Sequence, residues 1–450
     1  MKEEQRKYGL TMAIAMVIGI VIGSGIFFKA DDILVMTDGN VALGCFVLIV
    51  GAFGIIFGGI TIAEWAKITD DAGGIISYGE KAFGKKFAFF IGWFQMVVYH
   101  PALSAIICFV AANYTLMLFS NVTFLQDKIW EVTIFYIISI YMINTFSAKL
   151  AGYLQTTAMA IKMIPLFLIG ILGILFGDPS CITAEPITSA GIMAGTSAIV
   201  AAAFSYDGWS IAPTICHEIK NAKRNLPLAL TIAPVIILVI YLLYFIGITS
   251  LISPDEIIRL QDGAFQVASA KLFGPSFGKL LLVGVVISVL GTSNGIILGS
   301  CRVPQAMAIR NELPYSESIA KINKRFDVSF FSHGISCLFT FIWLWIHYLT
   351  QTQEFVMNLH LDISSTPIVL MYIFYFCLYI GVILRARKGL IQGKFYGYIC
   401  PLFAMFGSII VIYGGMSSKT GKIDAIISII ILLSGWAVFS YVHRKKASGQ

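Results

Sequence analysis

The chain has 450 residues, of which 58% are hydrophobic and only 12% charged, and its formal net charge is +7 at pH 7. A soluble protein is about half apolar and a quarter charged, so this composition excludes a soluble domain and indicates a polytopic membrane protein. The first apolar run is too long for a cleavable signal peptide and lacks a small-residue cleavage site.

Twelve apolar runs are long enough to cross a bilayer as helices, which takes about 17 to 25 residues. In chain order they cover residues 10–36, 41–66, 87–119, 130–146, 156–176, 192–215, 228–252, 279–309, 329–350, 355–384, 395–415 and 424–442. The sequence therefore predicts an all-α integral membrane protein with twelve transmembrane helices in the lipid bilayer, as a single membrane domain.

The distribution of lysine and arginine predicts the orientation. With the N-terminus inside, 24 of the 31 basic residues fall on the inner side and 7 on the outer side, and the bias survives when Lys162 and Arg302, which can lie within spans, are left out. Cytoplasmic loops carry an excess of these residues, so we expect a multi-pass cell (plasma) membrane protein with both termini cytoplasmic. The same bias accounts for the positive net charge, which therefore indicates no nucleic-acid partner.

The eight cysteines show no C-x-x-C spacing, and most of them lie in apolar runs. Cysteine behaves there as a small hydrophobic residue. The sequence therefore predicts no metal site, no cofactor and no disulfide framework.

The first span is interrupted by Gly23, Ser24 and Gly25. A helix in lipid cannot leave its backbone groups unpaired, so an unwound stretch must line a cavity or bind a ligand. The half-helix after the break would begin with free N–H groups and the positive end of its dipole, which suits a carboxylate. Close packing of helices through small residues is the alternative explanation of the same motif.

The sixth span carries a second break with glycine and polar residues. Carbonyl groups at Phe204 and Ser205 would face an ammonium group. Asp207 is costly in mid-membrane and is therefore a functional candidate, or else a cap of the half-helix. Tyr206 and Trp209 would form an aromatic lid or a packed interface. Two such breaks in corresponding spans predict the substrate site of an inverted-repeat transporter, and together they suit a zwitterion.

Lys162 is a charged residue inside the fifth span. Either it snorkels to the interface, or its ammonium group replaces a sodium ion by bonding to carbonyls of the first span and to hydroxyls of the eighth, where Ser288 and Thr292 are candidates. A buried lysine could also carry a proton. His100, which precedes Pro101 in the third span, either faces the pathway or satisfies a kink.

Together these residues resemble the amino acid–polyamine–organocation (APC) superfamily, and within it the L-type amino acid transporter (LAT) group with its bacterial serine/threonine and alanine/serine/cysteine exchangers. The matching strings, in order along the chain, are Ile22-Gly-Ser-Gly-Ile-Phe27, Gly73-Gly74, Phe204-Ser-Tyr-Asp-Gly-Trp209, Glu218-Ile-Lys-Asn221 and Ala308-Ile-Arg-Asn311.

The resemblance implies a LeuT-like fold of five plus five helices in an inverted repeat, with discontinuous helices 1 and 6. Residues 8–178 would form the first repeat, 190–388 the second, and 394–443 two added C-terminal helices. The family's pattern places the substrate carboxylate on backbone around Val21, Ser24 and Gly25. It places the amino group on carbonyls at Phe204, Ser205 and Asp207, and its fifth-span lysine on Lys162.

The expected function is sodium-independent exchange of small neutral L-amino acids by alternating access, without enzyme activity. Animal relatives bind a heavy chain through an outer-loop cysteine between the third and fourth spans. Residues 120–128 contain no cysteine, so no disulfide-linked heavy chain is expected. A proton-coupled amino acid symporter and an amino acid/amine antiporter are the alternatives. The sequence shows neither the repeated filter of a channel nor the clustered catalytic residues of an enzyme.

Overall fold

The computed structural model describes residues 9–69, 71, 73–120, 122–178, 180, 198–199, 201–353, 363, 366–417 and 421–447, and these are helical apart from short connections. Eleven helices in this part of the chain are long and apolar enough to cross a membrane. The predicted span 192–215 is only partly described, so the number of twelve stays a prediction.

The helices of the first half follow the predicted spans, except that the fifth begins at Ala148 and not at residue 156. In order they are α1 (Leu10–Val21), α2 (Ser24–Met36), α3 (Val41–Ala66), α4 (Ile75–Phe83), α5 (Lys85–Phe94), η2 (Gln95–Tyr99), α6 (His100–Leu118), η3 (Thr123–Leu125), α7 (Ile129–Phe146), α8 (Ala148–Phe167), η4 (Leu168–Leu172) and α9 (Gly173–Phe176).

The second half continues with η6 (Trp209–Glu218), α11 (Ala222–Leu251), α12 (Pro254–Leu260), η7 (Gln261–Gly263), α13 (Ala264–Phe273), α14 (Pro275–Ser300), α15 (Val303–Ile309), α16 (Ser316–Ala320), α17 (Phe330–Thr352), α19 (Thr366–Arg387), η8 (Phe395–Ile399), α20 (Cys400–Ser417) and α21 (Gly421–Ala447).

Local sequence signals set several of these helix ends. The Asn40 side chain accepts a hydrogen bond from the Leu43 N–H at the start of α3, and Ser329 does the same for Ser332 at the start of α17. Such side chains satisfy one of the free N–H groups of the first turn, and so they fix where the helix begins.

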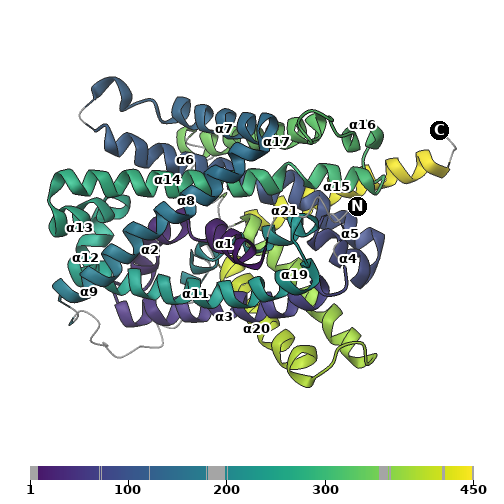
Figure 1. The fold of residues 1–450 in the computed structure, drawn as a ribbon, viewed down its shortest axis with the longest axis horizontal. Coiled ribbons are helices and arrows are strands. Elements are labelled where there is room, and N and C mark those ends of the chain that lie inside the picture. Colours follow the sequence, from purple (N-terminus) through teal and green to yellow (C-terminus); the bar gives the residue numbers. More distant parts are fainter. Residues whose placement is uncertain are drawn as a thin grey trace.

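The long helices run side by side, with α1 near the centre of the bundle (Figure 1). Helix α1 packs against α11, α14 and α8, and α3 packs against α11 and α20. In Figure 1, α9, α12 and α13 lie at the left end of the molecule, and α4, α5 and α15 lie at the right end with the N-terminus. The central position of α1 explains why seven of its twelve residues are buried.

The helical path stops twice near the middle of the bundle. Helix α1 ends at Val21, Ile22 is extended, and α2 begins at Ser24 after Gly23. Residues 201–205 are helical, residues 206–208 form a turn, and η6 continues as a 3₁₀ helix. Gly208 has a φ of +98°, a conformation that residues other than glycine rarely adopt, so this turn depends on glycine. These two interruptions leave backbone groups in the protein interior without helical partners.

Candidate functional site

The carbonyl groups released at the end of α1 bind the side chain of Lys162 from α8. The Lys162 Nζ donates to the Gly19 carbonyl at 2.6 Å, to the Ile22 carbonyl, and to Thr292 Oγ1 on α14 at 3.3 Å. The lysine is completely buried. A snorkelling side chain would reach toward water, whereas this ammonium group is turned inward onto the break and satisfies carbonyls that the helix leaves unpaired.

Glycine at positions 23 and 25 allows the unwound segment after α1 to approach Thr292 and Ser205 closely. A Cβ atom on Gly23 would lie 1.9 Å from Thr292 Oγ1, and one on Gly25 would lie 2.5 Å from Ser205 Cα. The Ser205 hydroxyl donates to the Gly25 carbonyl at 3.0 Å. The interruption after α1 and the one near residue 206 are therefore in direct contact.

Tyr241 of α11 joins the same two interruptions. Its hydroxyl lies 3.0 Å from the Val21 carbonyl and 2.7 Å from the Ser205 carbonyl, and its ring lies 5.0 Å from that of Tyr206. The Tyr206 hydroxyl in turn donates to the Leu48 carbonyl of α3 at 3.1 Å. Hence two tyrosines hold the interrupted segments against α11 and α3.

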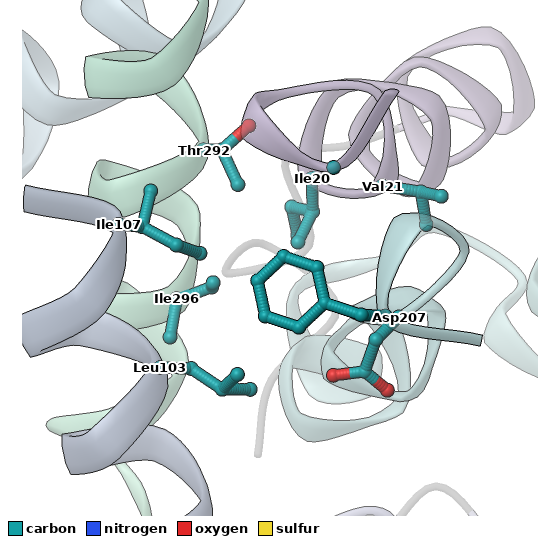
Figure 2. Close-up of a pocket in the computed structure, with 9 residues that line it drawn as sticks. Ile20, Val21, Leu103, Ile107, Asp207, Thr292 and Ile296 are labelled. Carbon is teal, nitrogen blue, oxygen red and sulfur yellow. The ribbon is translucent and has the colours of Figure 1, made fainter. Parts of the chain in front are cut away.

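A small cavity lies between these segments (Figure 2). Its lining residues are Ile20, Val21, Gly25, Leu103, Ile107, Phe204, Asp207, Thr292 and Ile296. The volume of the cavity is about 20 Å³, which is room for about one water and not for an amino acid. An amino acid therefore needs a wider cavity than this conformation provides.

Asp207 is the acidic side chain among those that line this cavity. Tyr99 of η2 donates from its hydroxyl to Asp207 Oδ2 at 2.6 Å. The other carboxyl oxygen, Oδ1, is buried and has no hydrogen-bond partner among the described groups. A buried polar atom without a partner is costly, so this oxygen is a candidate contact for a ligand.

The structure gathers most of the predicted site residues in one place. Val21, Gly25, Phe204, Asp207 and Thr292 line the cavity, and Gly23 and Ser205 lie beside it. Trp209 does not line it and packs on Tyr375 instead, with 5.1 Å between the ring centroids. Ser288 is buried on α14, but its hydroxyl has no partner among the described groups and does not reach Lys162. The side chain of Ser24 lies outside the described residues.

Sequence reasoning missed several residues of the site: Ile20, Tyr99, Leu103, Ile107, Tyr241 and Ile296. The aliphatic ones carry no signal because their runs are apolar on every side. Tyr241 could have been found, since it is one of two tyrosines in the largely apolar run of residues 228–252 and a buried hydroxyl needs a partner.

A second set of contacts lies at the end of the molecule that carries α4 and α15. Arg310, next to the end of α15, bonds Glu80 of α4 at 3.3 Å and Ser77 at 2.5 Å. A Cβ atom on Gly74, before α4, would lie 2.5 Å from the backbone of Pro213 in η6. We call α4, η6 and the region of Arg310 the inner closure, because the charge bias predicts that this end is cytoplasmic.

Comparison with known proteins supplies the context for this geometry. The chain matches the family described as "Amino acid permease" over residues 8–439. It is similar to the serine/threonine exchanger SteT of Bacillus subtilis (strain 168), with 29% identity over 99% of this chain and 98% of the relative.

Two mammalian relatives match over a shorter stretch. The b(0,+)-type amino acid transporter 1 of Mus musculus is 28% identical over 65% of this chain and 60% of its own length. The large neutral amino acids transporter small subunit 2 of Homo sapiens is 26% identical over 69% of this chain and 59% of its own length. The chain thus belongs to the amino acid permease family of the APC superfamily, and it is a multi-pass membrane transporter of amino acids, not an enzyme.

Proposed function

We propose that this permease exchanges small neutral L-amino acids across the cell membrane by alternating access and without sodium. The observation that carries the proposal is the position of Lys162, whose ammonium group occupies the oxygen ligands of the first break. A sodium ion would need the same oxygen atoms as ligands. Because the protein supplies the positive charge itself, no ion has to bind there.

The two interruptions offer complementary groups to a zwitterion. The backbone N–H groups at the start of α2, from Gly23 to Gly25, suit the carboxylate, and the dipole of α2 adds to this preference. The carbonyl groups at Phe204 and Ser205 suit the ammonium group. The substrate side chain would then lie between Ile107 and the other aliphatic residues of the cavity.

Small substrates fit this arrangement best. Leu103, Ile107 and Ile296 narrow the cavity from α6 and α14, so a large side chain would need more room than a small one. The relative that matches along nearly the whole chain is named a serine/threonine exchanger, which supports the same substrate class.

Alternating access follows if the chain consists of two inverted repeats. We assign residues 8–178 to the first repeat, 190–388 to the second and 394–443 to two added helices, with both termini cytoplasmic and with α1/α2 and the sixth span as the discontinuous helices. The contact between Gly25 and Ser205 would then join the two repeats at the site. Movement of one repeat against the other exposes such a site to each side in turn. We expect no disulfide-linked heavy chain.

A second candidate function is proton-coupled amino acid symport or amino acid/amine antiport. Asp207 favours it, because a carboxyl group with one unpartnered oxygen lines the cavity and could meet a second positive charge. An amine with a second positive charge, or a coupled proton, would make use of this carboxyl group.

Uptake into proteoliposomes separates these functions. Labelled serine, threonine, alanine and leucine are offered in sodium-free buffer to vesicles that contain or lack unlabelled amino acid. Exchange predicts uptake only when the vesicles contain an amino acid. Uptake into empty vesicles that follows an imposed proton gradient would replace exchange by symport, and uptake of amines alone would point to antiport.

A further inference from the structure

Buried polar groups surround the carboxyl of Asp207. Ser210 of η6 lies within hydrogen-bonding reach of the hydroxyl groups of Tyr99 and Tyr375. The Tyr375 hydroxyl is buried as well, and Asp207 Oδ1 is buried without a hydrogen-bond partner among the described groups. Together these atoms form a polar cluster of one carboxyl and three hydroxyl groups, which we call the Asp207 cluster.

The cluster holds no fixed positive charge. The titratable side chains that face Asp207 are tyrosines, namely Tyr99 from η2 and Tyr372 and Tyr375 from α19. Lys162 is bound to the first break, and among the described residues no ion pair reaches Asp207. His100 adjoins Tyr99 along the chain, and its two ring nitrogens have no hydrogen-bond partner within the described part.

An ionised carboxylate is expensive to bury unless a cation or several donors compensate it. The donors at the Asp207 carboxyl are the Tyr99 hydroxyl and the backbone N–H of Gly208, and no cation of the described residues compensates its charge. A carboxylic acid fits this environment better, because a bound proton cancels the charge. The neighbouring hydroxyl groups can accept that proton or pass it on, since each is both a donor and an acceptor.

We propose that Asp207 is a proton-binding site whose occupancy is linked to that of the substrate cavity. With the cavity empty, the Asp207 carboxyl holds a proton. When the substrate's ammonium group binds at the neighbouring carbonyls of Phe204 and Ser205, the Asp207 O–H bond breaks, the proton leaves to water, and the carboxylate adds its negative charge to the ammonium site. This inference rests on the proposed function, since it requires an amino acid in the cavity that Asp207 lines.

Thermodynamic linkage predicts how the affinity for substrate depends on pH. Because a proton and the substrate's ammonium group compete for one carboxyl, substrate binding releases protons, and the apparent affinity for substrate rises as the pH rises. The number of protons released per substrate bound can reach one and falls toward zero once the empty site is already deprotonated. A purely structural role for Asp207 would leave this number at zero at every pH.

Calorimetry of the purified full-length protein measures this number. Serine is titrated in buffers of different ionisation enthalpy between pH 5 and 8, and the slope of the binding enthalpy against buffer enthalpy gives the protons released. We expect a release approaching one proton in wild type and none in Asp207→Asn. Asp255→Asn, which removes an exposed carboxylate at the start of α12, should release as many as wild type.

Tyr99→Phe keeps the carboxyl and removes its donor, so it serves even if the asparagine variant does not bind. We expect proton release to persist, with a pH profile that differs from that of wild type, because the carboxylate loses one hydrogen bond. Binding without proton release in wild type, or equal release in Asp207→Asn, would overturn the inference and leave the proposed function intact. A wild type that binds neither serine, threonine nor alanine would refute the proposed function, and the inference with it.

Discussion

Replacing Lys162 by methionine tests most directly whether its ammonium group stabilises the unwound segment after α1. Methionine keeps most of the side-chain volume and removes the ammonium group, so the Gly19 and Ile22 carbonyls lose their donor. A hydrogen bond from a charged group is worth about 1.5–3 kcal/mol, and two such bonds give about 3–6 kcal/mol. We leave out the third bond, to Thr292, because at 3.3 Å it is long.

Loss of these hydrogen bonds should lower the exchange rate more than the affinity for substrate. Lys162 does not line the cavity, so it does not touch the substrate directly. It holds the end of α1, which we expect to move when the site opens. The lower value of about 3 kcal/mol corresponds to a roughly 100-fold change, and we expect the exchange rate to fall by about that factor.

The assay is amino acid exchange in proteoliposomes, normalised to the number of binding sites, with the dissociation constant measured in parallel. Lys279→Met is the matched control, because Lys279 is an exposed lysine on α14. We expect the dissociation constant in Lys162→Met to change by less than about ten-fold. An exchange rate within about threefold of wild type would refute the reasoning that the lysine stabilises a state of the transport cycle.

Three further substitutions and one control variant test other contacts of the protein. Gly25→Ala places a methyl group 2.5 Å from backbone, so exchange should be lost while the protein still inserts; normal exchange would contradict the close approach. Tyr241→Phe removes one hydroxyl shared by two carbonyls, and at about 1.4 kcal/mol the exchange rate should fall about ten-fold. Tyr136→Phe, which loses a bond at the α6–α7 contact, should exchange normally. Arg310→Gln should weaken the inner closure and speed alkylation of the buried Cys216 in η6, measured by mass spectrometry; unchanged labelling would mean that the arginine does not hold this end shut.

The polar residues of this site could be predicted from the sequence, because polar residues are conspicuous in apolar helices. Gly23, Gly25 and Asp207 stand out against their runs, and each lies at or beside the cavity. Lys162 stands out for the same reason, although the sequence alone left snorkelling and inward bonding open. The geometry favours inward bonding, because the amine contacts α1 and α14.

The apolar half could not be predicted in the same way. Leu103, Ile107 and Ile296 line the cavity, but aliphatic residues also face lipid on the same helices, and periodicity does not separate two apolar faces. Ser288, in contrast, is a predicted partner of Lys162 that does not contact it. It has the chemistry of a Lys162 partner and lies one turn of α14 from Thr292, but only Thr292 bonds the amine. Partner choice of this kind depends on the rotation of α14, which sequence spacing does not fix.

The account's central claim is that an amino acid binds where the two helix interruptions meet. Electron cryomicroscopy of the protein with bound serine tests this claim most directly. We predict substrate density with its carboxylate at the start of α2, near Gly23 to Gly25, and its ammonium group at the carbonyls of Phe204 and Ser205. Density at a different place in the bundle, with the cavity between Ile20 and Asp207 left closed, would contradict it.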